Sequence, residues 1–173
     1  MGDSLITVVA IVLAAVLMFI FPLMSVSERN DDIAQLTVST ATEEFVNEVT
    51  TTGNLTKNDY DKFSNKINST DDSFDVTIEV KRLDENPGKK GTWVEGTKIG
   101  ENLYYSEYTS QIIKELDETG KITLKKGDMI SVSVKNTNRT IAQMLRSFFY
   151  NSGSSDTYQI AASHSGVIMA NGR

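Results

Sequence analysis

The sequence predicts an α+β protein in which an N-terminal transmembrane helix, extended by an amphipathic helix, precedes a small antiparallel or mixed sheet packed with three helices. Three patterns predict this class. Residues 5–24 carry no charge, apolar residues recur at helical spacing through residues 34–49, and strictly alternating stretches follow beyond Gly53. We therefore divide the chain into a transmembrane helix at residues 4–25, an amphipathic stalk helix at 26–52 and an extracytoplasmic α+β head at 53–173.

The first segment, from Leu5 to Met24, is predicted to cross a membrane. It holds twenty uncharged residues, interrupted only by Thr7 and Pro22. At 1.5 Å of rise per residue, such a helix spans about 30 Å, the thickness of the hydrocarbon core of a bilayer. A cleaved secretory signal is the alternative, because small residues follow at Ser25–Ser27. The apolar run is longer than the roughly 7–15 residues of such a signal and no basic residue precedes it, so a retained anchor is favoured.

The side of the membrane on which the head lies is predicted from charge and composition. Arg29 is the single basic residue close to the span, which by the positive-inside rule favours a cytoplasmic head. Composition points the other way, because Ser, Thr and Asn make up 47 of 173 residues, cysteine is absent and the pI is about 4.8. We predict a single-pass protein of the cell membrane with its head outside the cytoplasm. The net charge of −6 argues against nucleic acid as a partner.

The stalk helix is predicted from a stripe of apolar residues on one face. The stripe consists of Ala34, Val38, Ala41, Phe45 and Val49. It is expected to pack against the head. Pro22 leaves open whether this helix continues the first one or is kinked and capped anew at Asp31 or Asp32.

Ile33 and Leu36 point away from this stripe on the helical projection. Contact with lipid headgroups or simple exposure explains such a pair, and contact with a helix of a partner subunit is the sharper hypothesis. The small residues Ala14 and Ala15 would allow close helix approach deeper in the bilayer. We predict a partner contact at these four residues and at Pro22, and a homo- or hetero-oligomer formed through the N-terminal helix.

The head is expected to begin with a helix and a strand. Gly53 ends the stalk, Thr56 and Asp59 form a capping pair, and Leu55 and Tyr60 occupy the positions of a hydrophobic staple. Residues 74–81 alternate between apolar and polar, which predicts a half-buried strand. Residues 84–102, with Pro87, four glycines and Trp93, are expected to form a long loop.

The second half of the head is predicted to alternate between helices and short strands. A helix carries Tyr105, Tyr108, Ile112 and Leu116 on one face and ends at Gly120. Strands are expected at residues 121–124 and 129–135 about a turn at 126–128, and again at residues 158–162 and 167–169. A helix with a wide apolar face is expected at residues 138–150.

The chain carries few residues suited to chemistry. His164 is the single histidine, and its neighbours Ser163 and Ser165 would point to the opposite face of a strand, so no hydrolase triad is expected. The acidic group of Asp71, Asp72 and Asp75 lacks the glycine and distal glutamate of an EF-hand loop, and a solvated loop is the better interpretation. We therefore predict no catalytic, cofactor-binding or metal-binding residues and no enzymatic activity.

An apolar helix at the N-terminus, extended by an amphipathic helix and followed by an α+β head, resembles type IV pilins and pseudopilins. Pro22 stands where such proteins often carry a helix-melting proline, whereas Thr7 replaces their acidic residue. Residues 127–134, followed by 141–150, also resemble pilin-like proteins of Gram-positive bacteria found with tight-adherence pilus machinery. In this family the helix is both the membrane anchor and the core of the filament.

The resemblance implies a pilin-like minor subunit or a membrane-anchored accessory of a surface-filament or secretion apparatus. Its expected partners are the lipid bilayer and other pilin-like or assembly-machinery proteins. The alternative is a membrane-tethered extracytoplasmic binding or sensor module.

Overall fold

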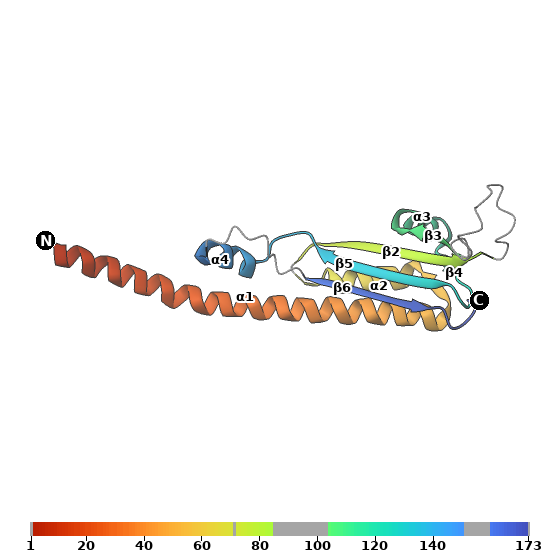
Figure 1. The fold of residues 1–173 in the computed structure, drawn as a ribbon, viewed down its shortest axis with the longest axis horizontal. Coiled ribbons are helices and arrows are strands. Elements are labelled where there is room, and N and C mark those ends of the chain that lie inside the picture. Colours follow the sequence, from red (N-terminus) through yellow and green to blue (C-terminus); the bar gives the residue numbers. More distant parts are fainter. Residues whose placement is uncertain (1, 71, 85–103, 151–159, 173) are drawn as a thin grey trace, which may run out of the picture.

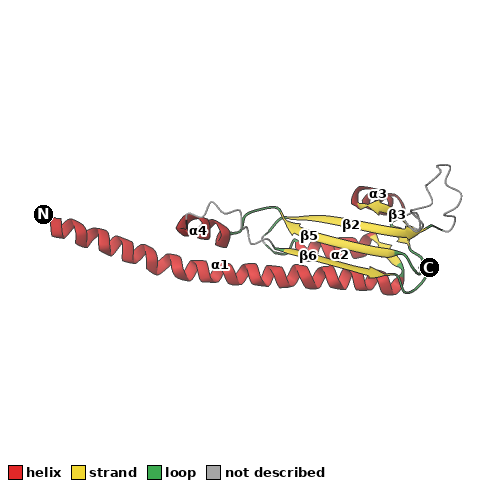
Figure 2. Ribbon diagram, viewed as in Figure 1, coloured by secondary structure: helices red, strands yellow, loops and turns green. Residues whose placement is uncertain are grey.

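The computed structural model describes residues 2–70, 72–84, 104–150 and 160–172. Over these residues the chain has an α+β fold with four helices and two small antiparallel sheets (Figures 1 and 2). The helices are α1 (Gly2–Thr52), α2 (Lys57–Ile67), α3 (Thr109–Thr119) and α4 (Ile141–Tyr150). The strands are β1 (Asn54–Thr56), β2 (Phe74–Leu83), β3 (Tyr104–Tyr108), β4 (Lys121–Thr123), β5 (Met129–Asn136) and β6 (Ala161–Val167).

The N-terminal helix α1 is continuous through Pro22, and no new helix begins at Asp31 or Asp32. A proline inside a helix removes one backbone hydrogen bond, but the flanking turns here keep the helical path. Figure 1 shows α1 as one long rod whose N-terminal part projects beyond the rest of the molecule. Among the described residues it alone is long and apolar enough to span a membrane, with a mean hydropathy of 3.0 over its most apolar window.

The second half of α1 packs against the head. All five residues of the predicted stripe are buried, which confirms that part of the sequence analysis. The buried face is wider than the stripe, because Thr42 and Val46 are buried as well. Thr42 meets the requirement of a buried hydroxyl by donating a hydrogen bond to the carbonyl oxygen of Val38 at 2.7 Å.

Four strands form the main sheet in the order β3-β2-β5-β6, with every neighbouring pair antiparallel. The register sets Val76, Ile78 and Val80 of β2 opposite Val134, Val132 and Ile130 of β5, so that the apolar residues of both strands share one face. Residues of α1, α2 and α3 join them in a single core cluster. The other face carries serines, lysines and acidic residues, as expected for an antiparallel sheet with one solvated side.

The outer edge of β6 is covered by α1. The side-chain amide of Gln35 donates to the carbonyl oxygen of Ala161 at 2.8 Å and accepts from its N–H at 3.0 Å. Just beyond the strand, the N–H of Met169 donates to the carbonyl oxygen of Thr50. These bonds satisfy backbone groups that an edge strand would otherwise present to another chain.

The far end of the head is closed by the smaller sheet of β1 and β4. Gly53 has a φ of +67°, and a Cβ at this position would lie 2.3 Å from the carbonyl oxygen of Ala170. Gly120 ends α3 in the left-handed conformation, as the sequence predicts. Thr56 caps α2 by accepting a hydrogen bond from the N–H of Asp59, which is also as predicted.

One expectation about the third helix is wrong, whereas strands do form at the two places expected after it. Tyr105 and Tyr108 belong to strand β3, where they pair with Arg82 and Glu79, and α3 begins only at Thr109. Aromatic residues suit a pleated surface, and pairing with β2 outweighs their helical spacing. The strands on either side of the turn at residues 126–128 do not pair with each other, since β4 joins β1 and β5 joins β2.

The C-terminal elements also differ from expectation in their bounds. Helix α4 begins at Ile141 rather than at Asn138. The last strand covers Ala161–Val167, whereas the sequence predicts separate strands at residues 158–162 and 167–169. The predicted long loop, which includes Trp93, lies outside the described residues except for Asp84. Asp71 and Tyr158 also lie outside the described residues.

Candidate functional surface

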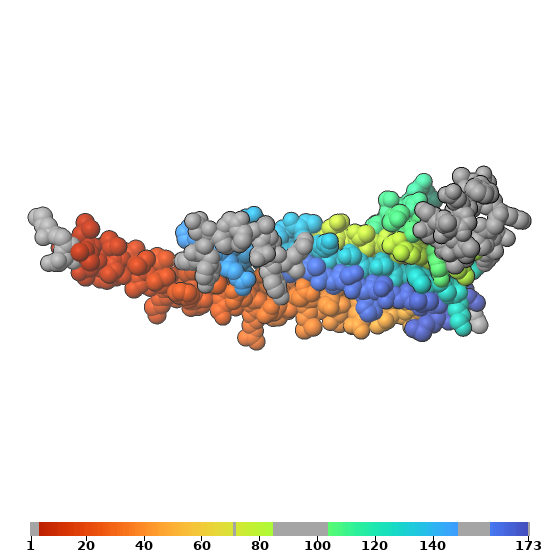
Figure 3. All heavy atoms as spheres, in the orientation of Figure 1, coloured from red at the N-terminus to blue at the C-terminus, as the bar shows by residue number. Residues whose placement is uncertain are grey.

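The first half of α1 presents apolar side chains on every side. The large residues from Leu5 to Leu23 are exposed except Leu17 and Ile20, which are half-buried, and none of the most apolar window is fully buried by the rest of the described chain. Figure 3 shows this half as a narrow rod leading into the broad head. A continuous apolar surface of this size is stable only in contact with another apolar phase, such as lipid or protein.

Ile33 and Leu36 lie outside the face of α1 that is buried in the core of the head, and the two residues are 56% and 68% exposed. Ala14 and Ala15 are exposed on the apolar half. Because 18 residues make about five helical turns, Ala15 lies on the same side of a straight helix as Ile33. Pro22 is exposed between the two groups. The helix thus aligns these residues along one side, and contact with a partner at that side stays a prediction.

Thr140 joins α4 to α1. Its hydroxyl donates a hydrogen bond to Asp31 Oδ2 at 2.7 Å and accepts one from the N–H of Gln143 at 3.3 Å. The side-chain oxygen of Gln143 accepts in turn from the N–H of Thr140 at 3.2 Å, which completes a capping box at the start of α4. The Thr-x-x-Gln pattern is visible in the sequence, and its recognition would have placed the start of this helix correctly.

Asp31 is buried at this junction, and burial raises the pKa of its carboxyl group above the ordinary value. The hydrogen bond from Thr140 opposes this shift in pKa, because it stabilises the charged form. The nearby carboxylates of Asp72 and Asp32 raise the pKa further, whereas the Arg146 guanidinium lowers it. The guanidinium of Arg146 also pairs with Glu28 at 2.6 Å, so that a second polar contact holds α4 to α1.

A cleft of about 480 Å³ opens beside this junction. Three segments line it: α1 near Asp31, the chain between α2 and β2, and the chain between β5 and α4. Its charged residues are Asp31, Asp72 and Arg139, and Ile33 forms part of its apolar wall. Asp72 accepts a hydrogen bond from the side-chain amide of Asn138, which ties two of the segments together. The cleft offers hydroxyl and amide groups to a polar ligand.

His164 lies in the middle of β6 opposite Val132. Its neighbours Ser163 and Ser165 are exposed on the other face of the sheet. The pattern of alternation therefore separates the imidazole from both hydroxyls, as predicted. Within the described ranges, no group of three His, Cys, Asp or Glu side chains is arranged to hold a metal ion.

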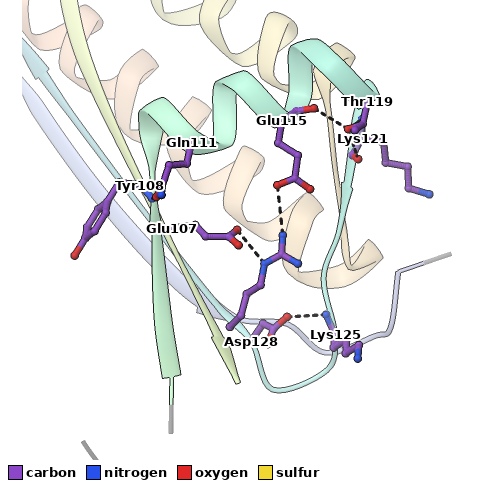
Figure 4. Close-up of polar contacts among 9 residues, drawn as sticks. Glu107, Tyr108, Gln111, Glu115, Thr119, Lys121, Lys125 and Asp128 are labelled. Atoms are coloured by element: carbon purple, nitrogen blue, oxygen red, sulfur yellow. Dashed lines mark hydrogen bonds and ion pairs between the residues drawn. The ribbon is translucent and has the colours of Figure 1, made fainter. Parts of the chain in front are cut away.

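A second polar cluster at the far end of the head has a structural role (Figure 4). Arg82 of β2 lies 2.9 Å from Glu107 of β3 and 3.9 Å from Glu115 of α3. Nearby, the buried carboxylate of Asp128 accepts hydrogen bonds from the N–H groups of Leu83 and Lys125, each at 2.8 Å. These contacts satisfy the charged groups and hold β2, β3, α3 and the turn before β5 together. The cluster therefore stabilises the fold at this end of the head.

No protein-family model matches this chain. Comparisons with curated proteins and with solved structures likewise find no match.

Proposed function

We propose that this protein is a membrane-anchored, non-enzymatic pilin-like minor subunit or accessory of a surface-filament or secretion apparatus, with its head outside the cytoplasm. The observation that carries the proposal is the form of α1. One uninterrupted helix exposes an apolar first half and buries one face of its second half in the core of the head. The anchor and the head are thus joined without a flexible hinge.

This rigid connection suits an assembly role better than a simple tether. A tether needs only a hydrophobic segment and tolerates a loose linker to its head. In this chain a contact made anywhere along α1 fixes the orientation of the head, because stripe residues such as Phe45 and Val49 are buried in the same core. The outward side that carries Ile33, Leu36 and Ala15 supplies a surface on which a neighbouring helix would pack. The partners in this proposal are the bilayer and other pilin-like or assembly-machinery proteins.

A membrane-tethered binding or sensor module is the second candidate, and the cleft beside Asp31 favours it. The volume of about 480 Å³ is in the range of small-molecule sites. In this alternative the cleft would take a polar ligand, and Ile33 would belong to the ligand site instead of a subunit contact.

Crosslinking separates the two candidates. The chain contains no cysteine, so a single Cys at Ile33 or Leu36 reports only its own surroundings. In native membranes, oxidation should trap one dimer or one hetero-adduct from either position. The control is Lys114→Cys on α3, whose side chain is 77% exposed and lies on the head. Equal crosslinking from all three positions, or none from any, would favour the tethered module.

A further inference from the structure

Helix α4 carries an exposed apolar face that is turned away from the core of the head. Ile141, Met144 and Phe148 are 57%, 49% and 78% exposed, whereas Ala142 is buried. At about 100° per residue the three exposed side chains fall on one side of α4, with Gln143 and Ser147 on another. The helix is therefore amphipathic, and its apolar side does not face the core of the head.

Two contacts fix where α4 lies along α1. Thr140, at the start of α4, bonds Asp31, and Arg146, further along α4, pairs with Glu28. Residues later in α4 therefore lie beside residues earlier in α1, nearer to its apolar half. The C-terminal end of α4 points to that half, and Figures 1 and 3 show α4 beside α1 between the sheet and the projecting part of the rod.

The level of the Arg146–Glu28 contact matches the layer of lipid headgroups, and the Thr140–Asp31 contact lies just outside that layer. If Met24 ends the hydrocarbon-spanning part of α1, Glu28 lies about 6 Å and Asp31 about 10 Å beyond it, at 1.5 Å per residue. The headgroup region adds roughly 5–8 Å on each side of the hydrocarbon core. Arg146 pairs with Glu28 inside this layer, and Phe148 lies nearer still to the hydrocarbon.

The charge of this segment also suits a membrane surface. Residues 139–150 contain two arginines and no Asp or Glu, although the whole chain has a net charge of −6. Helices that lie in the membrane interface combine a large apolar face with basic residues at its border. The other large apolar groups at this level, such as Val26, are exposed as well and continue the apolar surface of α1.

We propose that α4 is an interfacial helix whose Met144 and Phe148 side chains enter the headgroup and upper acyl region of the bilayer that α1 spans, with Ile141 at the outer border of the headgroup layer. This inference rests on the membrane anchoring in the proposed function. Lipid is favoured over a second copy of the chain because α4 is fastened to α1 at headgroup depth. The helix then sets the height and the rotation of the head above the membrane.

Depth-dependent quenching tests this inference on the full chain. The protein is reconstituted in vesicles of phosphatidylcholine with phosphatidylglycerol, and a single Cys at Met144 or Phe148 carries a small environment-sensitive fluorophore. Lipids that carry a nitroxide just below the headgroup should quench the probe at both positions several-fold more than at Ser147→Cys. Position 147 is the matched control, because it is exposed on the polar side of the same helix. Circular dichroism confirms that each variant remains folded.

Val12→Cys, in the apolar half of α1, reports the anchor separately. Its probe should be quenched best by a nitroxide deep in the acyl chains. If position 12 is quenched and positions 144 and 148 behave like 147, the anchor stands and the interfacial helix is disproved. If position 12 is not quenched, the membrane anchoring in the proposed function fails, and this inference fails with it. Probes at 144 and 148 that escape lipid quenching but self-quench as the ratio of protein to lipid rises would assign the face to a second copy.

Discussion

At the scale of single residues, Asp31 is a carboxyl group whose charged form is destabilised by its surroundings in the fold. It is buried beside Asp72 and Asp32, and its stabilising partners are the Thr140 hydroxyl and the Arg146 guanidinium. Burial raises its pKa in the folded chain, so the folded chain holds the proton more tightly than the unfolded chain. Its contribution to stability is therefore complete below the ordinary carboxyl pKa of about 4 and is lost as the pH rises through the raised value.

Asp31→Asn should remove this pH dependence. The amide oxygen can still accept the hydrogen bond from Thr140, and the buried group no longer ionises. Denaturant unfolding of the full chain in detergent micelles, followed at several pH values between about 4 and 7, should show a flatter stability profile for the variant. Ser39→Ala, at an exposed position of the same helix, is the control and should keep the wild-type profile, because it changes no titratable group. Identical profiles for wild type and Asp31→Asn would contradict the assignment.

Phe45 anchors the stalk part of α1 in the core. Its side chain is 3% exposed, and its ring stacks on that of Phe63 in α2 with centroids 4.7 Å apart. Phe45→Ala should lower the free energy of unfolding by about 3–5 kcal/mol, because it removes buried surface and leaves a cavity. Ile33→Ala on the opposite face should change it by less than about 0.5 kcal/mol. Urea melts of the full chain in micelles measure both, and a loss below about 1 kcal/mol for Phe45→Ala would show that the ring is not part of the folded core.

At the scale of elements, the contact between α1 and β6 depends on a residue without a side chain. A Cβ at Gly166 would lie 2.7 Å from Thr50 Cγ2 and 3.5 Å from Val46 Cγ1. The helix and the strand approach closely here, and the backbone bond from Met169 to Thr50 lies next to this contact. The close approach fixes how the helix lies on the sheet.

Gly166→Ala should therefore destabilise the head by about 1–3 kcal/mol, because the strand and the helix must separate. Adding Thr50→Ser should recover part of the loss, since serine keeps the hydroxyl that bonds the carbonyl oxygen of Asn47 but lacks the clashing methyl group. Ser165→Ala, on the solvated face of the same strand, is the control. Strictly additive effects of the two substitutions would show that the side chains at positions 166 and 50 are not in contact.

At the scale of the whole molecule, the continuous helix ties the position of the head to that of the apolar N-terminal part. The full chain should remain in the membrane pellet after alkaline carbonate extraction, because the run from Leu5 to Met24 is long enough to stay in the hydrocarbon core. Protease added to cells without a wall should digest the head. If the head is digested only after lysis, the predicted orientation is wrong. If carbonate releases the chain, the predicted membrane anchor is wrong.

Patterns within about two helical turns determined several elements from the sequence alone. The apolar stripe of the stalk, the capping pair of Thr56 and Asp59, the alternation of β2 and the stop at Gly120 are each set by neighbours along the chain. Such signals report the local backbone, because the period of apolar residues and the chemistry of caps need no distant partner.

The tertiary structure decided the features that depend on distant partners. Tyr105 and Tyr108 have helical spacing, but hydrogen bonding to β2 makes their segment a strand. Asp31 and Thr140 are 109 positions apart, so no local pattern reveals that one docks the helix that the other caps. The apolar face of α4 was visible in the sequence, whereas its exposure was not. Periodicity identifies which side chains share a face, and only the packed chain shows whether the protein itself buries that face, because burial is set by contacts between elements.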